Sequence, residues 1–71
     1  MIKITIRDGE DFIKLGQAMK KAGIVSSGVE AKIYINNGEV RVNGEIETRR
    51  GRKLRKGDQI DFQDETVVIE Q

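Results

Sequence analysis

The sequence of 71 residues contains no cysteine, no histidine and no proline. Without cysteine, disulfides and thiolate metal sites are excluded, and without histidine no imidazole can bind a metal or carry protons near neutral pH. A serine or threonine nucleophile needs a neighbouring base, and the usual base is absent. The glycine loops that hold nucleotide phosphates are missing as well. We therefore predict a protein that is not an enzyme and that needs no cofactor or metal.

Two pairs of carboxylates remain as candidates for acid–base chemistry, Asp8 with Asp11 and Asp61 with Asp64. Their neighbours in the sequence are typical of turns and solvated surfaces. A chain of this length also has little room for a concave pocket that excludes water. We expect no catalysis from either pair.

Aromatic residues and long apolar runs are scarce. Phe12, Tyr34 and Phe62 are the only aromatic residues, too few for a protein that stacks the bases of single strands. No apolar run approaches the roughly 20 residues that span a membrane. Residues 1–7 alternate apolar with polar side chains and lack the apolar core of a signal peptide. We expect a soluble protein of the cytoplasm, built as one domain over residues 1–71.

Charge is abundant but unevenly distributed. Residues 1–40 carry six basic and five acidic side chains, residues 41–56 carry seven basic and two acidic ones, and residues 57–71 carry five acids and no base. The net charge of +1 therefore conceals a strongly basic segment. Its densest part, residues 49–56, holds six cations and is called the basic run below. Such a patch favours a polyanionic partner whatever the total charge.

The spacing of apolar residues predicts a strand at residues 2–6, followed by two helices. Phe12, Leu15, Met19 and Ala22 form one helical stripe, with Asp8 or Asp11 as the cap at its start and Gly23 at its end. Gly16 inside this helix suggests that something packs closely against it.

The second helix is predicted to start near Gly28, because residues 27–30 fit a capping box. Its apolar face is Ala31, Tyr34 and Ile35, so we interpret Tyr34 as a core residue, and Lys32 lies on the opposite face.

Four short strands are predicted after the helices. Val40 and Val42 alternate with charged residues, and Asn43-Gly44 is a strong signal for a tight hairpin. Ile46 begins the return strand, and Leu54 is the single apolar anchor within the basic run. Alternating strands follow around residues 60–62 and 66–69, after turns at residues 57–58 and 63–64. The predicted fold class is α+β, with a two-helix corner packed on a small, mostly antiparallel sheet.

Nucleic-acid binding is the function that these features favour. Lysine and arginine bind backbone phosphates, and arginine can also lie against an exposed base. The basic run contains no acid, which argues against a merely solvated connection. We interpret Ser26 and Ser27 mainly as helix caps. A helix N-terminus is also a favourable site for phosphate, so both roles can hold at once. With few aromatics, recognition of folded RNA by its shape and backbone is expected.

Residues 22–27, 30–32, 38–44 and 57–60 resemble the RNA-binding domain of small-subunit ribosomal protein four, also called the alpha-L motif. The resemblance covers about two-thirds of the chain, and residues 47–53 look closer still to the short stand-alone bacterial members, the YbcJ-like proteins. It implies binding of structured RNA, often ribosomal RNA, and contact residues at Ser27, Lys32, Asn36, Asn37 and Asn43. Many members carry an arginine where this chain has Gly28, and the basic run is the expected replacement.

The resulting hypothesis is a stand-alone, monomeric RNA-binding protein that acts on ribosomal RNA or in ribosome assembly. We expect one basic face made of residues from the hairpin, the basic run and the second helix: Lys32, Arg41, Arg49, Arg50, Arg52, Lys53 and Arg55. Two alternatives stay open. The helical corner could bind DNA as a helix-turn-helix, or the chain could be a protein-interaction module without a nucleic-acid partner.

Overall fold

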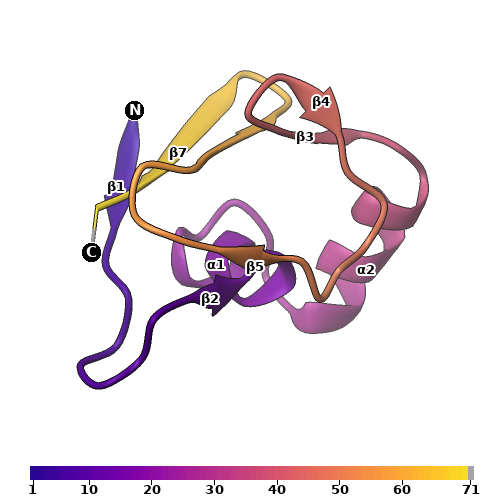
Figure 1. The fold of residues 1–71 in the computed structure, drawn as a ribbon. Helices are drawn as coiled ribbons and strands as arrows, with labels where there is room; N and C mark the ends of the chain where they lie inside the picture. Colours follow the sequence, from indigo (N-terminus) through magenta and orange to yellow (C-terminus); the bar gives the residue numbers. More distant parts are fainter. Residues whose placement is uncertain (71) are drawn as a thin grey trace.

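The computed structural model describes residues 1–70. Its main sheet has five strands in the order β1-β7-β6-β3-β4. β1 (Ile2–Ile4) lies parallel to β7 (Glu65–Ile69), whereas β6 (Gln59–Phe62), β3 (Val40–Val42) and β4 (Glu45–Ile46) join the sheet by antiparallel pairing. The first strand of the chain therefore pairs with the last one (Figure 1).

A second, two-stranded sheet lies in front of the first helix in Figure 1. It pairs β2 (Ile13–Lys14) with β5 (Lys53–Leu54), and β2 leads directly into α1 (Leu15–Lys21). The second helix is α2 (Gly28–Asn36). Both helices and both sheets contribute to one core, whose buried side chains are Ile4, Ile6, Leu15, Ala18, Met19, Val25, Ala31, Ile35, Val40, Val42, Leu54, Ile60, Phe62, Val67 and Ile69.

The start of the first helix differs from the prediction. The helix begins at Leu15, and neither Asp8 nor Asp11 caps it; the capping position is Lys14, without a side-chain hydrogen bond. Phe12, which the stripe placed on the helix, precedes β2 instead. The reason is tertiary, because the backbone at residues 13–14 pairs with β5. The end is as predicted, with Gly23 in the left-handed region at φ 77°.

The second helix agrees with its prediction. The hydroxyl of Ser27 accepts a hydrogen bond from the amide of Glu30 at 3.1 Å. The Glu30 carboxylate reaches back to the amide of Ser26 at 3.0 Å, one residue earlier than a standard capping box. Ala31 and Ile35 are buried, and Tyr34 packs on the core with its ring centroid 4.8 Å from that of Phe62. The prediction that Tyr34 belongs to the core is thus confirmed.

The predicted turns are also present. Asn43 and Gly44 have φ values of 52° and 87°, as a tight hairpin of the primed type requires, and they connect β3 to β4. Gln63, at φ 54°, turns the chain between β6 and β7. The α+β class with a mostly antiparallel sheet is confirmed. No helix within residues 1–70 is long and apolar enough to cross a membrane.

Candidate RNA interface

The basic run is fixed to the rest of the fold at its centre. Leu54 is fully buried in the core, as its position in the sequence predicted. Together with Lys53 it forms β5, which pairs with β2. The run is therefore an anchored segment of the domain, and its cations project from a defined backbone.

The backbone of the basic run also caps the first helix. The amide of Leu15 donates to the carbonyl of Arg52 at 2.8 Å, and the amide of Gly16 donates to the carbonyl of Arg50 at 3.1 Å. These are two of the amides that a helix start leaves without a partner inside the helix. The basic run takes the place of a capping side chain, which explains why α1 begins at Leu15.

A buried carboxylate holds two arginines of the run. Glu47 is only 6% exposed. Its oxygens accept from Arg49 Nε at 2.9 Å, from Arg49 Nη2 at 3.0 Å and from Arg52 Nη1 at 3.0 Å. A further bond comes from the backbone amide of Arg49 at 3.0 Å. The Arg49 guanidinium bonds both carboxylate oxygens and therefore has a defined orientation, whereas Arg52 is held to the same carboxylate by one hydrogen bond.

This cluster has electrostatic consequences. The hydrogen bond from the Arg49 side chain, with those from the Arg49 backbone and Arg52, lowers the pKa of Glu47 from 4.5 to about 2, against the opposing effect of burial. The same contact raises the pKa of Arg49. The carboxylate is therefore ionised at any physiological pH. Part of the positive charge of the run is compensated, although the Arg49 side chain is still 73% exposed to a partner.

Arg50 and Lys53 each lie against another element. The side chain of Arg50 covers Gly16, so close that a Cβ atom added there would stand 2.7 Å from its Cγ. The close packing predicted at Gly16 is thus provided by the basic run. The Lys53 ammonium lies 4.8 Å from the centroid of the Phe12 ring, in a cation–π contact. Arg49, Gly51, Arg52 and Lys53 together line one shallow hollow.

The predicted contact residues of α2 are surface residues. Lys32, Asn36 and Asn37 are exposed, and the Asn37 amide lies 3.5 Å from a Glu39 carboxylate oxygen. The hydroxyl of Ser27 is used by its helix cap. Lys32 and Asn36 are one turn apart on α2, so they share one face.

The predicted residues of the hairpin and the last turn already take part in the fold. Arg41 donates to the carbonyl of Gly44 at 3.3 Å. The Asn43 side chain donates to Asp58 and accepts from the amide of Gln59, both at 3.0 Å. The Arg55 backbone amide donates to Asp58 at 2.8 Å, while its side chain is exposed. Arg41 and Arg55 line neither of the two hollows that involve the basic run.

Three residues near the basic run were missed by the sequence analysis. They are Glu47, Lys14 and Lys20, which entered the sequence argument only through the counts of acidic and basic side chains. Lys14, Lys20 and Arg50 in fact line a second hollow. A sequence signal existed for Glu47 alone, since an acid two residues before an arginine cluster is a natural ion-pair partner.

Comparison with known proteins places the whole fold in one family. The family model described as the S4 domain matches residues 4–70. A Bacillus subtilis (strain 168) protein named "Probable ribosome maturation protein RlbA" is 43% identical over 53 residues, which cover 75% of each chain. The Escherichia coli (strain K12) protein YbcJ is 35% identical over 57 residues, covering 80% of this chain and 81% of its own.

A solved structure of the same family also matches this chain. The solution structure of YbcJ from Escherichia coli, described as revealing an alpha-L motif involved in RNA binding, matches with a TM-score of 0.74 and 30% identity. The match covers 100% of this chain and 89% of the other. This agreement confirms the resemblance seen in the sequence. The chain belongs to the S4 domain family.

Proposed function

We propose that this chain is a non-catalytic protein that binds structured RNA through the basic run and the surfaces beside it. The observation that carries the proposal is the fixed geometry of that run. Its backbone caps α1, Leu54 anchors it in the core, and the buried Glu47 holds the side chains of Arg49 and Arg52. A cationic segment that is held in place loses little conformational freedom when a polyanion binds.

The RNA that we propose is ribosomal RNA, bound during ribosome assembly. Support comes from the relative named "Probable ribosome maturation protein RlbA" and from the description of YbcJ as an RNA-binding alpha-L motif. We further propose that the chain acts as a single domain over residues 1–71, as a monomer in the cytoplasm. We propose no catalytic step, because the chain has neither histidine nor cysteine to act as a base or a nucleophile. Of the carboxylates considered for acid–base chemistry, Asp61 is already used within the fold, where it accepts a hydrogen bond from the Thr66 hydroxyl at 2.9 Å.

The test is a binding titration over a range of salt concentrations. The partners are hairpin and junction fragments of ribosomal RNA, with duplex DNA of equal length as competitor. If five to seven cations meet phosphates, the logarithm of affinity falls against the logarithm of salt concentration with a slope of roughly −4 to −6. Light scattering during the titration reports the number of protein chains per RNA.

Each alternative predicts a different outcome. Equal competition by duplex DNA would favour the helix-turn-helix hypothesis, in which α2 enters a groove. An affinity that does not depend on salt, or no retention of any RNA, would favour a protein-interaction module. If the protein does bind RNA, crosslinking in cells followed by sequencing of the attached RNA identifies the target.

A further inference from the structure

A hollow of about 340 Å³ lies where α1, the first residue of α2 and the basic run meet. Three of its lining residues are cations, and none is an acid; the full set is Lys14, Gly16, Gln17, Lys20, Gly28, Arg50 and Gly51. Of these residues, only Arg50 was predicted from the sequence to lie at the interface. Lys14 is the last residue of β2 and Lys20 lies in α1, so the tertiary fold adds two cations to the basic run.

The cations of this hollow have no acidic partner in the part of the chain that is described. The ion pairs within residues 1–70 join Lys3 with Glu70, Arg7 with Glu10, and Glu47 with Arg49 and Arg52. Lys14, Lys20 and Arg50 belong to none of these pairs. The basic run thus holds two kinds of arginine. Arg49 and Arg52 are compensated by Glu47, whereas Arg50 is directed to the hollow without a counter-charge.

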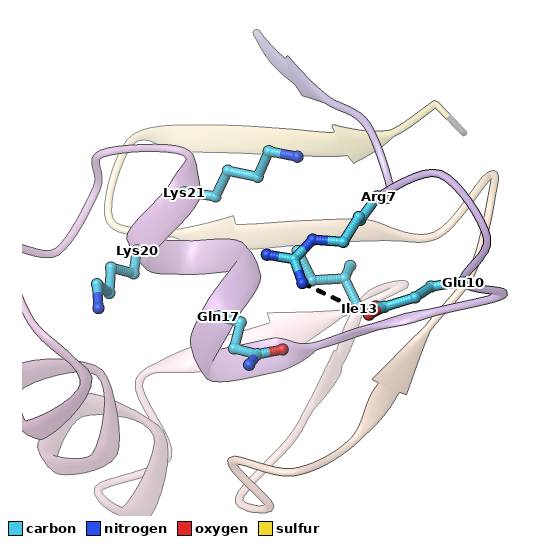
Figure 2. A pocket seen from close by; sticks show the side chains of 6 residues that line it. All are labelled: Arg7, Glu10, Ile13, Gln17, Lys20 and Lys21. Atoms are coloured by element: carbon cyan, nitrogen blue, oxygen red, sulfur yellow. Dashed lines mark ion pairs between the residues drawn. The ribbon is translucent and has the colours of Figure 1, made fainter.

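A second hollow, on the neighbouring side of α1, makes the contrast clear. It measures about 420 Å³, and it shares Gln17 and Lys20 with the first (Figure 2). Here, however, Arg7 is paired with Glu10 at 3.9 Å, and the Lys21 ammonium donates to the carbonyl of Thr5. Two of its three cations thus have partners within the protein, which makes it the weaker candidate for an anion.

Glycine keeps the first hollow open. A Cβ atom added at Gly28 or Gly51 would meet nothing within 4 Å, so both positions border open space. At Gly16 the missing side chain has another use, because it lets the Arg50 side chain lie flat against the helix. The aliphatic part of Arg50 is thereby held in place next to Lys14 and Lys20.

From these observations we propose that the hollow is a binding site for a backbone phosphate of the RNA, contacted by Lys14, Lys20 and Arg50. The inference rests on the proposed function and extends it to α1. A phosphate is a compact anion with several acceptor oxygens, which suits two ammonium groups from β2 and α1 and one guanidinium from the basic run that line the same hollow. The RNA backbone then follows the groove between α1 and the basic run.

The first experiment compares single lysine variants by RNA affinity and salt slope. Lys14→Ala and Lys20→Ala each remove one cation of the site, and Lys3→Ala removes one on β1, where the lysine is paired with Glu70. We expect about five-fold weaker binding for each site variant at about 0.15 M salt, because one phosphate contact and its release of counterions are lost. The magnitude of the salt slope falls by about 0.7–0.9 per lost phosphate contact. Melting temperatures confirm that all three variants are folded.

The results of this experiment distinguish a failure of the phosphate site from a failure of the proposed RNA binding. If the wild-type protein binds no RNA, the proposed function itself fails. If the wild type binds and the two site variants behave like Lys3→Ala, RNA binding stands but the phosphate site is wrong.

The second experiment places charge in the hollow without touching a cation. Gly28→Glu adds a carboxylate at the start of α2, where the helix dipole favours an acid, so the fold is retained. Gly28→Gln adds a neutral side chain of nearly the same size. We expect at least ten-fold weaker RNA binding for the Glu variant and a much smaller loss for the Gln variant. Equal losses, or no loss in either, would overturn the assignment of a phosphate to this hollow.

Discussion

Arg50 lies flat on Gly16, and the carbonyl of Arg50 accepts a hydrogen bond from the Gly16 amide at 3.1 Å. One residue pair thus connects the first helix to the basic run by both backbone and side chain. Because the side-chain contact is not possible with a Cβ atom at residue 16, the glycine is tied to the position of the arginine. The stability of the helix start and the geometry of the interface depend on the same contact.

Gly16→Ala is therefore expected to damage both properties. The new Cβ atom would stand 2.7 Å from Cγ of Arg50, near the root of the side chain, so the arginine has to move. The gain of about 1 kcal/mol in helix propensity is opposed by about 1–3 kcal/mol of overpacking. We predict a free energy of unfolding lowered by about 1 kcal/mol and weaker RNA binding, measured by denaturant titration and by the affinity for the same RNA fragment.

Gly28→Ala is the matched control, since Gly28 also lies in the first turn of a helix and its added Cβ would meet nothing within 4 Å. It should leave stability unchanged or raise it by up to about 1 kcal/mol. Equal stability for the two variants would contradict the role assigned to the Gly16–Arg50 contact.

Glu47→Gln tests whether the buried carboxylate organises the basic run. The variant keeps the shape but loses the charge that two guanidinium groups share, and hydrogen bonds to charged groups contribute about 1.5–3 kcal/mol. We predict a loss of about 1–3 kcal/mol in the free energy of unfolding at neutral pH. Glu45→Gln, at an exposed acid of β4, is the control and should change stability by less than about 0.5 kcal/mol.

The pH dependence of this difference follows from the pKa of Glu47. The pKa is lowered in the folded state, from 4.5 to about 2, so the carboxylate stabilises the fold fully above pH 4.5. That stabilisation is lost as the pH falls from 4.5 towards 2, because over this range the unfolded chain takes up a proton at Glu47 that the folded protein does not yet bind. The gap in melting temperature between wild type and Glu47→Gln should narrow over this range. A gap of constant size throughout would show that the carboxylate is not held as described.

Variants of Asn43 test whether its side chain stabilises the fold or contacts the RNA. Its side chain bonds Asp58 and the amide of Gln59, and its backbone has a φ of 52°. Asn43→Gly keeps the turn conformation and loses the two hydrogen bonds, which should lower the free energy of unfolding by about 1–2 kcal/mol. Asn43→Ala adds the strain of a left-handed alanine, about 1 kcal/mol more. Thermal melts of the three proteins separate these effects.

RNA affinity of the Asn43→Gly variant then tests the contact that the family resemblance implied. We expect wild-type affinity at a temperature well below the melting point, because both polar ends of the Asn43 side chain are used within the fold. A loss of five-fold or more in a folded variant would place this amide on the RNA instead.

Local patterns in the sequence were sufficient for most of the fold. The capping serine at Ser27, the hairpin at Asn43-Gly44 and the buried anchor at Leu54 each depend on residues a few positions apart, and all three are present. The start of α1 was mispredicted, because the amides of Leu15 and Gly16 find their partners in residues 50–52, more than thirty positions along the chain. No local pattern contains that information.

The sequence by itself determined that the chain has no histidine or cysteine chemistry and that its positive charge is concentrated in residues 49–56. It also determined that the chain is an α+β domain related to the alpha-L motif. Only the tertiary structure decided what each cation of that segment does. Arg49 and Arg52 turn to a buried Glu47, while Arg50 joins Lys14 and Lys20 around one hollow. The physical reason is that charge is a property of composition, whereas compensation of charge depends on distances that only folding brings about.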